Sequence, residues 1–464
     1  MRWSRATLAA LLSLTSLSRP ASALQLDVDD PNSIKSAAST IAYGMMKYYT
    51  GNQTGQIPGE LPQPFYWWEA GSMFMTMVEY WYYTGDSTYN DVTTQALQFQ
   101  VGDDNDYMPA NQTKDEGNDD QVFWAFAAMS AAELGYPNPP ADQPQWLALA
   151  QAVFNTQAAR WDHSSCGGGL RWQIFTFNNG YDYKNAISNG GFFQLSARLA
   201  RYTGNETYAD WATKMFDWLA QSPLLDTKSN ATKYTVNDGT STLQNCSSAD
   251  NLQWTYNYGT LISGAAYMYN HTNGSSIWQE RLSALLEGAY DVFFPAQYGG
   301  EVMSEITCEQ GQTCDNDQPS FKAYLSRWLA VAAQLAPFAA AQISPKLKAS
   351  AAGAAKQCSG GTGGTECGRR WYQDTWDGFT GVGEQMSALS IVQSNLIAVG
   401  DGVQAPLSAN TGGKSTGDPS AGTGSGDATP KVAGEVTGRD KAGAVILTIG
   451  LVVVTVGGGV FMVL

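Results

Sequence analysis

The sequence predicts an all-α protein, an (α/α)6 barrel in which six helix pairs close into a ring. Apolar residues recur at helical spacing along most of the chain. Two similar segments, Trp81–Asp91 and Ala200–Asp210, each end one helix at a glycine and begin another after a polar turn. Helices rich in Gly, Ala and aromatic residues alternate with more amphipathic helices, as expected for an inner and an outer ring. An open solenoid of helix pairs would show the same periodicity.

The individual helices follow from this alternation. The inner helices, which are apolar all round, are predicted at residues 66–84, 119–134, 189–203, 256–270, 320–337 and 380–398. The outer helices, which are more amphipathic, are predicted at residues 32–49, 87–101, 144–160, 207–221, 276–294 and 344–357. Strand-forming patterns are few, and one small hairpin is predicted at Leu170–Phe177.

The N-terminal residues 1–23 are predicted to be a secretory signal peptide. Arg2 and Arg5 precede an apolar stretch, and Ala21-Ser22-Ala23 provides a cleavage site of small residues. Residues 24–404 then form the barrel domain. Secretion places the six cysteines in an oxidising compartment, where three disulfides are expected.

The C-terminal residues are predicted to be a stalk and an anchor signal. Residues 405–441 are rich in Gly, Ser and Thr, which indicates a flexible stalk. Small residues near Asp427, a polar spacer and the uncharged tail 442–464 are typical of a glycolipid (GPI) anchor signal. We predict attachment at Asp427, with Gly426 as the alternative. The other interpretation is a tail-anchored membrane span, although no Lys or Arg follows the apolar residues.

Composition excludes several classes of function. The chain carries 42 acidic and 26 basic residues, so it lacks the basic surface that nucleic-acid binding requires. Its two histidines, His163 and His271, cannot form a three-His zinc site. We therefore expect no metal, no cofactor and no nucleic-acid partner. Aromatic residues reach 12%, which suits stacking on sugar rings, although the same residues also fill contacts between helices.

The cysteine spacing and the glycosylation motifs fit a secreted protein. Cys308–Cys314 and Cys358–Cys367 would each close a short loop, which leaves Cys166–Cys246 as the third pair among 15 connectivities. Asn-x-Ser/Thr motifs occur at Asn52, Asn111, Asn205, Asn230, Asn245, Asn270 and Asn273.

Two adjacent aspartates, Asp119 and Asp120, precede the apolar second inner helix. An acidic residue at this position commonly caps a helix and complements its dipole, which accounts for one of the two. A pair of carboxylates can also cleave a glycosidic bond. Adjacent Cα atoms lie about 3.8 Å apart, which favours the roughly 5–5.5 Å carboxylate gap of a retaining enzyme. Two charges this close separate their pKa values, so one acid stays ionised while the other holds a proton.

Long loops at one rim of the predicted barrel hold Asp, Asn, Trp, Tyr and Gly at high density. They span residues 56–68, 102–120, 161–189, 226–258, 298–320 and 368–381. The sugar-binding candidates in or beside them are Trp67, Trp68, Asp104, Asn118, Asp162, Trp172, Tyr256, Tyr258 and Trp376. The two tryptophans could equally plug the barrel, and Asp103, Asp104 and Asp106 could bind sugar, hold calcium or form a solvated turn.

Four motifs resemble those of glycoside hydrolase family 76. Within this family the match is to the GPI-anchored fungal cell-wall branch, whose members are called mannan endo-1,6-α-mannosidases. The four motifs are Tyr66–Gly71, Gly117–Gln121, Cys166–Gln173 and Tyr183–Gly190, and the resemblance spans about residues 25–400. It implies an (α/α)6 fold and retaining chemistry on α-1,6-linked mannose. It also implies that Asp119 is the nucleophile and Asp120 the acid/base.

The resemblance further implies a role in wall assembly. The enzyme would cut the mannose core of GPI-anchored glycoproteins and transfer them to β-glucan, at the plasma membrane and in the cell wall. We expect a monomer, with α-mannan or a GPI-core glycan as donor, and transfer in the cell with slow hydrolysis as a side reaction; an ordinary mannosidase is the alternative. A catalytically inactive mannan-binding surface protein and a structural adhesin are further alternatives.

Overall fold

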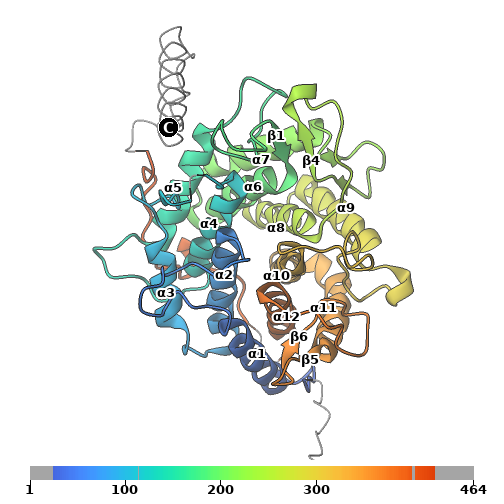
Figure 1. Cartoon of the computed structure of the whole chain (residues 1–464). Coiled ribbons are helices and arrows are strands. Elements are labelled where there is room, and N and C mark those ends of the chain that lie inside the picture. Colours follow the sequence, from blue (N-terminus) through green and yellow to red (C-terminus); the bar gives the residue numbers. More distant parts are fainter. Residues whose placement is uncertain (1–23, 113, 400–402, 424–464) are drawn as a thin grey trace, which may run out of the picture.

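Six inner helices form a closed ring. A computed structural model describes residues 24–112, 114–399 and 403–423. Each inner helix packs against the next, and the last packs against the first, so the ring closes (Figure 1). This confirms the barrel and excludes the open solenoid. The inner helices are α2 (Trp67–Thr84), α4 (Asn118–Glu133), α6 (Ala186–Thr203), α8 (Thr255–His271), α10 (Phe321–Leu335) and α12 (Val382–Ser394).

Six outer helices surround the ring. They are α1 (Pro31–Met46), α3 (Asn90–Phe99), α5 (Trp146–Ala159), α7 (Glu206–Gln221), α9 (Ser276–Phe293) and α11 (Pro337–Gln357). The predicted bounds agree to within a few residues except at α11. That helix was expected to begin at residue 344, but it begins at Pro337 and carries Pro345 inside. Proline is well tolerated at the first helical position, which explains the start at Pro337.

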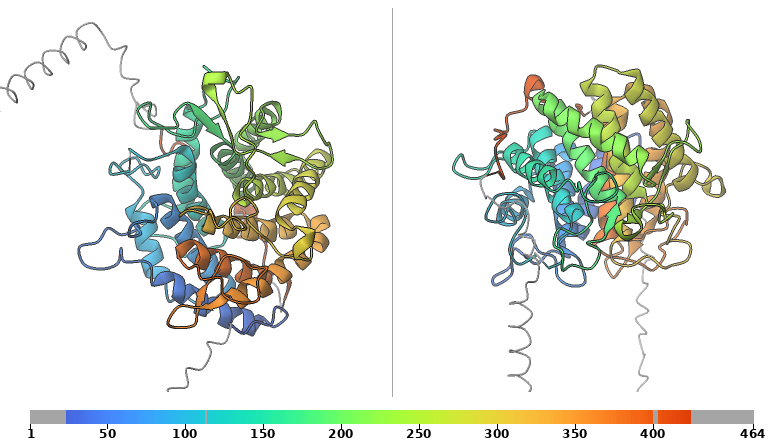
Figure 2. Two further views of the ribbon diagram at one scale, coloured as in Figure 1. Left: turned by 45° about the vertical axis from the view of Figure 1, so that its right-hand side comes forward. Right: turned by 90° about the horizontal axis from the view of Figure 1, so that it is seen from above.

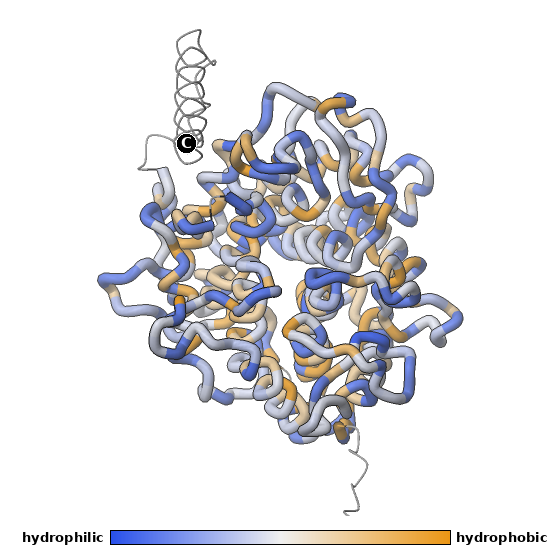
Figure 3. Tube along the Cα trace, viewed as in Figure 1, coloured by the Kyte–Doolittle hydropathy of each residue, from blue (hydrophilic) through white to orange (hydrophobic). Residues whose placement is uncertain are grey.

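The core lies between and inside the two rings. Close helix packing depends on glycine at a few points: a Cβ at Gly71 would lie 2.8 Å from the ring of Trp124, and one at Gly264 2.3 Å from the ring of Phe193. Hydrophobic residues follow the helices, whereas hydrophilic residues gather in the peripheral loops (Figure 3). The inner helices are buried on all sides, as their apolar sequences predict.

Three short antiparallel strand pairs lie outside the helices. Strand β1 (Tyr183–Asn185) pairs with β4 (Gly239–Ser241), β2 (Leu225–Asp226) with β3 (Thr235–Val236), and β5 (Cys358–Gly360) with β6 (Glu366–Cys367). The predicted hairpin at Leu170–Phe177 is wrong. The backbone of Leu170 instead bonds the side chain of Asn189, and Phe175 begins a turn. The segment forms only an isolated antiparallel bridge, between Gln173 and Gly117 before α4.

The three disulfides of the structure join the predicted pairs, Cys166–Cys246, Cys308–Cys314 and Cys358–Cys367. Six of the seven glycosylation motifs present an exposed asparagine. Asn270 is the exception: it is half-buried on α8, and its side chain bonds Arg201 Nε at 2.7 Å and the Leu335 carbonyl at 3.3 Å.

Residues 403–423 form a strap along the outside of the barrel (red beside α5 in Figure 1). We expected a flexible stalk from residue 405, and for the described part, through residue 423, this is incorrect. The Leu407 amide donates to the Glu133 carbonyl at 2.7 Å, and farther along the side chain of Asn155 donates to the Pro419 and Ala421 carbonyls. The polar composition of the segment suggested flexibility. Its backbone is instead ordered because polar side chains of α5 form hydrogen bonds with it.

The predicted signal peptide, the attachment site and the apolar tail lie outside the described residues. Within the described ranges, no helix is long and apolar enough to cross a membrane.

Candidate active site

One rim of the barrel holds a cleft of about 720 Å³. The inner helices begin at this rim, and the loops that precede them lie at the same end of the barrel (Figure 2). Five of the six predicted rim loops contribute lining residues, and the loop at residues 368–381 contributes none. The lining includes Tyr66, Trp67, Trp68, Asp119, Asp120, Trp172, Tyr183, Asn185, Asp238, Tyr256, Asp317 and Phe321.

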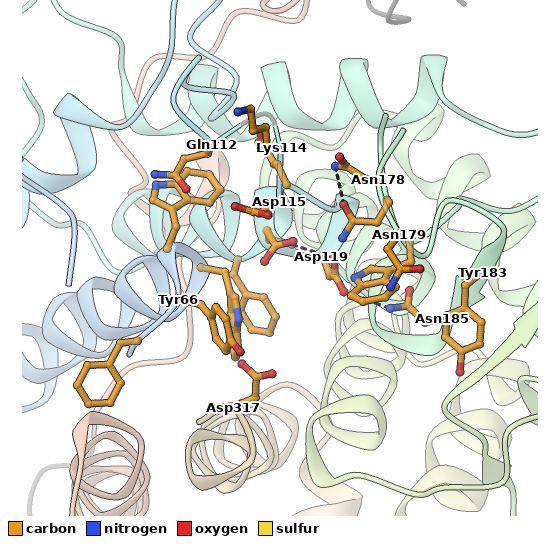
Figure 4. Close-up of a pocket in the computed structure, with 18 of the residues that line it drawn as sticks. Tyr66, Gln112, Lys114, Asp115, Asp119, Asn178, Asn179, Tyr183, Asn185 and Asp317 are labelled. Atoms are coloured by element: carbon orange, nitrogen blue, oxygen red, sulfur yellow. Dashed lines mark hydrogen bonds between the residues drawn. The ribbon is translucent and has the colours of Figure 1, made fainter. Parts of the chain in front are cut away.

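Asp119 and Asp120 lie in the first turn of α4 and line the cleft. Figure 4 shows Asp119 in this position. The Gly117 amide donates to Asp120 Oδ2 at 2.6 Å, so Asp120 also caps the helix. Asp119 Oδ1 accepts from the Asp120 amide at 3.1 Å, and its Oδ2 accepts from Asn185 Nδ2 at 3.1 Å. A Cβ at Gly117 would lie 2.3 Å from Asp119 Oδ1 and 2.8 Å from Asp120 Oδ2, so glycine is required beside the pair.

The surroundings give the two carboxyl groups different pKa values. Burial raises the pKa of Asp119 to about 7, and the hydrogen bond from Asn185 limits this rise because it favours the ionised form. Burial, and then the charge of Asp119, raises the pKa of Asp120 well above its usual value. Asp119 therefore ionises first while Asp120 keeps its proton. One ionised and one protonated carboxyl is the arrangement that retaining glycoside cleavage requires.

Four of the predicted sugar-binding aromatic residues reach the cleft. Trp67 and Trp68 come from the start of α2, Trp172 from the loop before β1, and Tyr256 from the start of α8. The ring of Tyr256 stacks on Phe321 at a centroid distance of 3.8 Å and an interplanar angle of 7°. Both tryptophans also contact the core, so they line the cleft and help to plug the barrel.

Two predicted residues instead fix the rim loops. Asn118 is buried and accepts a hydrogen bond from Arg160 at 3.0 Å. Asp162 forms 3.0 Å ion pairs with Arg171 and Lys184, which hold the Cys166 loop against β1. Burial opposes ionisation of Asp162, but hydrogen bonds from neighbouring serines and from Lys184 lower its pKa below its usual range.

Three further predicted residues lie away from the cleft. Tyr258 is fully buried, and its hydroxyl accepts from the Val236 amide and donates to Gln253. The indole of Trp376 donates to the Phe379 carbonyl at 2.8 Å and packs on the β5 glycine. Asp104 is exposed on the outer surface, near the strap. Within the described residues no group of His, Cys, Asp or Glu is arranged to hold a metal ion, so the calcium interpretation of this turn finds no support.

Three polar residues of the cleft were not singled out from the sequence. Asn185 bonds Asp119, Asp238 accepts from Asn257 Nδ2 at 3.1 Å, and Asp317 lies across the cleft from Asp119 (Figure 4). Burial raises the pKa of Asp238 to about 6 and that of Asp317 to about 7. The sequence indicated these residues only by position, because each lies in a predicted rim loop. Asn185 and Asp317 come just before an inner helix, whereas Asp238 lies between β3 and β4.

The sequence model of glycosyl hydrolase family 76 matches residues 33–410. The chain is 50% identical over 438 residues to the mannan endo-1,6-alpha-mannosidase DCW1 of Saccharomyces cerevisiae, covering 94% of this chain and 95% of the relative. It is 43% identical to the mannan endo-1,6-alpha-mannosidase DFG5 of Candida albicans, with 95% of each chain covered.

Two solved structures share the fold. The first is Dfg5 from Chaetomium thermophilum in complex with glucosamine, at 45% identity and a TM-score of 0.80, covering 85% of this chain and 97% of that one. The second is an inactive variant of the alpha-1,6-mannanase GH76A of Salegentibacter sp. HEL1_6 in complex with alpha-1,6-mannotriose. It has 18% identity and a TM-score of 0.62, covers 78% of this chain and 98% of that one, and shows likeness of fold alone.

Proposed function

The chain belongs to glycosyl hydrolase family 76 and is a glycosidase, and on that premise we propose that it is a retaining α-1,6-mannosidase and transglycosylase. The observation that carries the proposal is the pair of carboxyl groups at the start of α4, which lie in the cleft and differ in their affinity for protons. The names of the fungal relatives support α-1,6-linked mannose as the substrate.

The first half of the reaction breaks the glycosidic bond. Asp119, as nucleophile, attacks the anomeric carbon of the donor and forms a covalent glycosyl ester through one carboxylate oxygen. The bond to the leaving oxygen breaks, and Asp120 gives its proton to that oxygen. The side chain of Asn185 donates to Asp119 and accepts from the Ser188 amide at the start of α6. Because α6 fixes Asn185, the nucleophile is oriented before the donor binds.

The second half releases the sugar to an acceptor. Asp120, now ionised, removes a proton from the acceptor hydroxyl as that oxygen attacks the anomeric carbon, and the ester bond to Asp119 breaks. Water as acceptor gives hydrolysis, whereas a sugar hydroxyl gives transfer. We propose that the acceptor in the cell is a β-glucan, and that a GPI anchor attached at Asp427 holds the enzyme beside GPI-linked donors at the cell surface and the wall.

Charge in the cleft supports this class of donor. Among the described residues that line it, six carry a carboxyl group and one, Lys114, is a cation. Such a cleft disfavours acidic glycans and suits neutral sugars or a sugar that carries an amine. Glucosamine, which carries such an amine, is the ligand in the structure of the Chaetomium relative.

The test compares Asp119→Asn and Asp120→Asn in a secreted form that ends at Thr423, and so keeps the strap, with α-1,6-mannotetraose as substrate. Asp119→Asn should abolish turnover and keep ligand binding, because the shape remains but the nucleophile is lost. Asp120→Asn should slow cleavage by about 10²–10⁴-fold, and least for an α-mannosyl fluoride, whose leaving group needs no proton.

Asp115→Asn is the matched control, because Asp115 is an exposed cleft carboxylate outside the first turn of α4. Its turnover should stay close to that of the wild type. Wild-type activity in both the Asp119 and the Asp120 variants would refute the assignment of the pair.

A further inference from the structure

The loop between Trp172 and β1 carries two stacked phenylalanine rings at the rim of the cleft. The rings of Phe175 and Phe177 lie 5.4 Å apart between centroids, at an interplanar angle of 19°. The side chain of Phe177 is 71% exposed. Gln173, Asn178 and Asn179, which lie on either side of this pair in the chain, line the cleft. The ring pair is therefore next to the cleft and outside the core.

The loop is held in a defined shape. The Asn178 amide donates to the Phe175 carbonyl at 3.0 Å and closes a turn. Its side chain donates to Gln173 Oε1 at 2.9 Å. Gly180 adopts a φ of +94° and lies so close to Trp172 that a Cβ would be 2.4 Å from its ring. These contacts hold the turn against the cleft wall, so the position of the aromatic pair is fixed before a ligand arrives.

Aromatic residues lie on both sides of the acid pair, Tyr66 on one side and the Phe175–Phe177 turn on the other. Tyr66, at the start of α2, and the residues Asn178 and Asn179 lie on opposite sides of Asp119 (Figure 4). A glycan that spans the cleft would thus place its cleaved bond at Asp119, with one side toward Tyr66 and the other toward the Phe175–Phe177 turn. These two sides correspond to a donor side and an acceptor side.

We propose that Phe175 and Phe177 form a binding platform for the glucan acceptor; this rests on the transfer reaction proposed above. In a β-linked glucose ring every ring substituent is equatorial, so each face presents a flat surface of C–H groups. The axial 2-hydroxyl of mannose interrupts one face. A flat, exposed aromatic pair favours the first kind of ring, because its faces match in shape and neither group loses a hydrogen bond on contact.

The experiment uses a secreted form that ends at Thr423, and so keeps the strap, with Phe177→Ala and a Phe175→Ala/Phe177→Ala double variant. Phe99→Ala is the matched control, because Phe99 is also an exposed phenylalanine, but it ends the outer helix α3 and its neighbours in the chain do not line the cleft. The donor is α-1,6-mannotetraose, and the acceptors are labelled β-1,3- and β-1,6-linked gluco-oligosaccharides. Two quantities are measured: the ratio of transfer to hydrolysis, and the affinity for each acceptor without donor.

Loss of one stacking contact should lower the transfer ratio roughly five-fold, corresponding to about 1 kcal/mol, and the double variant should lower it further. Donor hydrolysis should fall less than transfer, because water as the acceptor does not stack on the rings. Phe99→Ala should behave as wild type. An unchanged transfer ratio and unchanged acceptor affinity in the double variant would overturn the platform.

The outcomes also distinguish this proposal from the function on which it rests. A wild-type protein that hydrolyses the donor but forms no glucan adduct would refute transfer. The affinity for the gluco-oligosaccharides then tests the platform by itself. Equal affinity of the wild type and the double variant overturns the platform, and weaker binding by the double variant supports it. If the double variant loses binding to phosphatidylcholine vesicles while glucan binding is unchanged, the rings contact lipid and the platform is also overturned.

Discussion

Asn185 connects the nucleophile to the framework of the barrel. It ends β1 and precedes α6, where its Oδ1 accepts from the Ser188 amide at 3.2 Å as an N-cap. Its Nδ2 donates to Asp119 Oδ2 at 3.1 Å. One side chain thus stabilises a helix start and the ionised form of Asp119, because a donated hydrogen bond favours a carboxylate over the neutral acid.

Replacing Asn185 with serine should move the acidic limb of the pH–activity profile to higher pH. Serine keeps an N-cap oxygen, but it lacks the amide that reaches Asp119. Without that donor the pKa of Asp119 rises further, and the nucleophile ionises only at higher pH. We expect a shift of about one pH unit, measured as kcat/KM against pH. Asn179→Ser, which changes a cleft amide with no contact to Asp119, should leave the limb in place; an equal shift there would contradict the explanation.

Asp317 is predicted to destabilise the fold at neutral pH. Its pKa is raised from 3.8 to about 7, chiefly by burial and then by the charge of Asp315. The folded protein therefore binds more protons than the unfolded chain, and stability falls as pH rises from about 4 to 7. Asp317→Asn should increase the free energy of unfolding by up to about 4 kcal/mol at pH 8, because the amide cannot ionise and its oxygen can still accept a hydrogen bond.

At pH 4 the folded carboxyl is protonated and the carboxyl of the unfolded chain is close to its ordinary pKa of 3.8, so most of the gain should disappear. Denaturant unfolding of the variant and wild type at pH 4 and pH 8 measures the difference. Asp103→Asn, at an exposed aspartate outside the cleft, serves as control. A gain of equal size at both pH values would show that the charge of Asp317 is not its cause.

The sequence does not predict which side chains of an inner helix point into the cleft. Tyr256 and Tyr258 are two positions apart at the start of α8, and both were expected in the cleft. Successive residues turn by about 100°, so these two point in nearly opposite directions. Tyr256 lines the cleft, whereas Tyr258 points to the outer layer near Val236. Both faces of an inner helix are apolar, so periodicity does not show which one meets the cleft.

At the scale of elements, the strap changes the expected role of the C-terminal segment. The Tyr82 hydroxyl donates to the Gln404 carbonyl at 2.6 Å, the Arg201 side chain to the Leu407 carbonyl, and the Asp418 amide to Gln151 Oε1. These bonds join the strap to α2, α6 and α5. The described part of the segment is therefore an element of the fold, attached to both rings of helices.

Removing the strap should destabilise the barrel. A chain that ends at Val399 loses at least six hydrogen bonds and uncovers the face of α5, at about 1 kcal/mol per bond. We expect the free energy of unfolding to fall by more than about 3 kcal/mol, measured by urea denaturation. A chain that ends at Thr423 keeps every strap contact and should match the longer protein. Equal stability of the two truncated chains would mean that the strap contributes nothing.

Elements that depend on local sequence were predicted better than those that depend on distant partners. Inner and outer helices carry their periodicity within a few turns, so their positions could be predicted. Strand β1 is three residues long and pairs with β4, more than fifty residues later. No local pattern identifies such a partner. The same reason explains the strap, whose polar residues gain order only through side chains of α5.

The whole molecule is a ring in which the first helix meets the last. Helix α12 packs against α1 and α2, and the Tyr48 hydroxyl lies 3.1 Å from that of Thr380. Alternating helix pairs predicted the barrel, but closure itself is a property of the assembled molecule. The sequence could not distinguish a ring from a solenoid, because each repeat contacts only its neighbours until the ends meet.

Ring closure also constrains the order of events during synthesis. Helix α12 leaves the ribosome about 350 residues after α1, a delay of roughly 20 to 70 s at ordinary rates of translation. Throughout that interval the faces of α1 and α2 that α12 will cover have no partner, so the nascent chain presents apolar surface to its surroundings. A premature stop before α12 leaves that surface permanently uncovered. Chaperones that hold unfinished chains should therefore remain bound to this protein until translation is nearly complete.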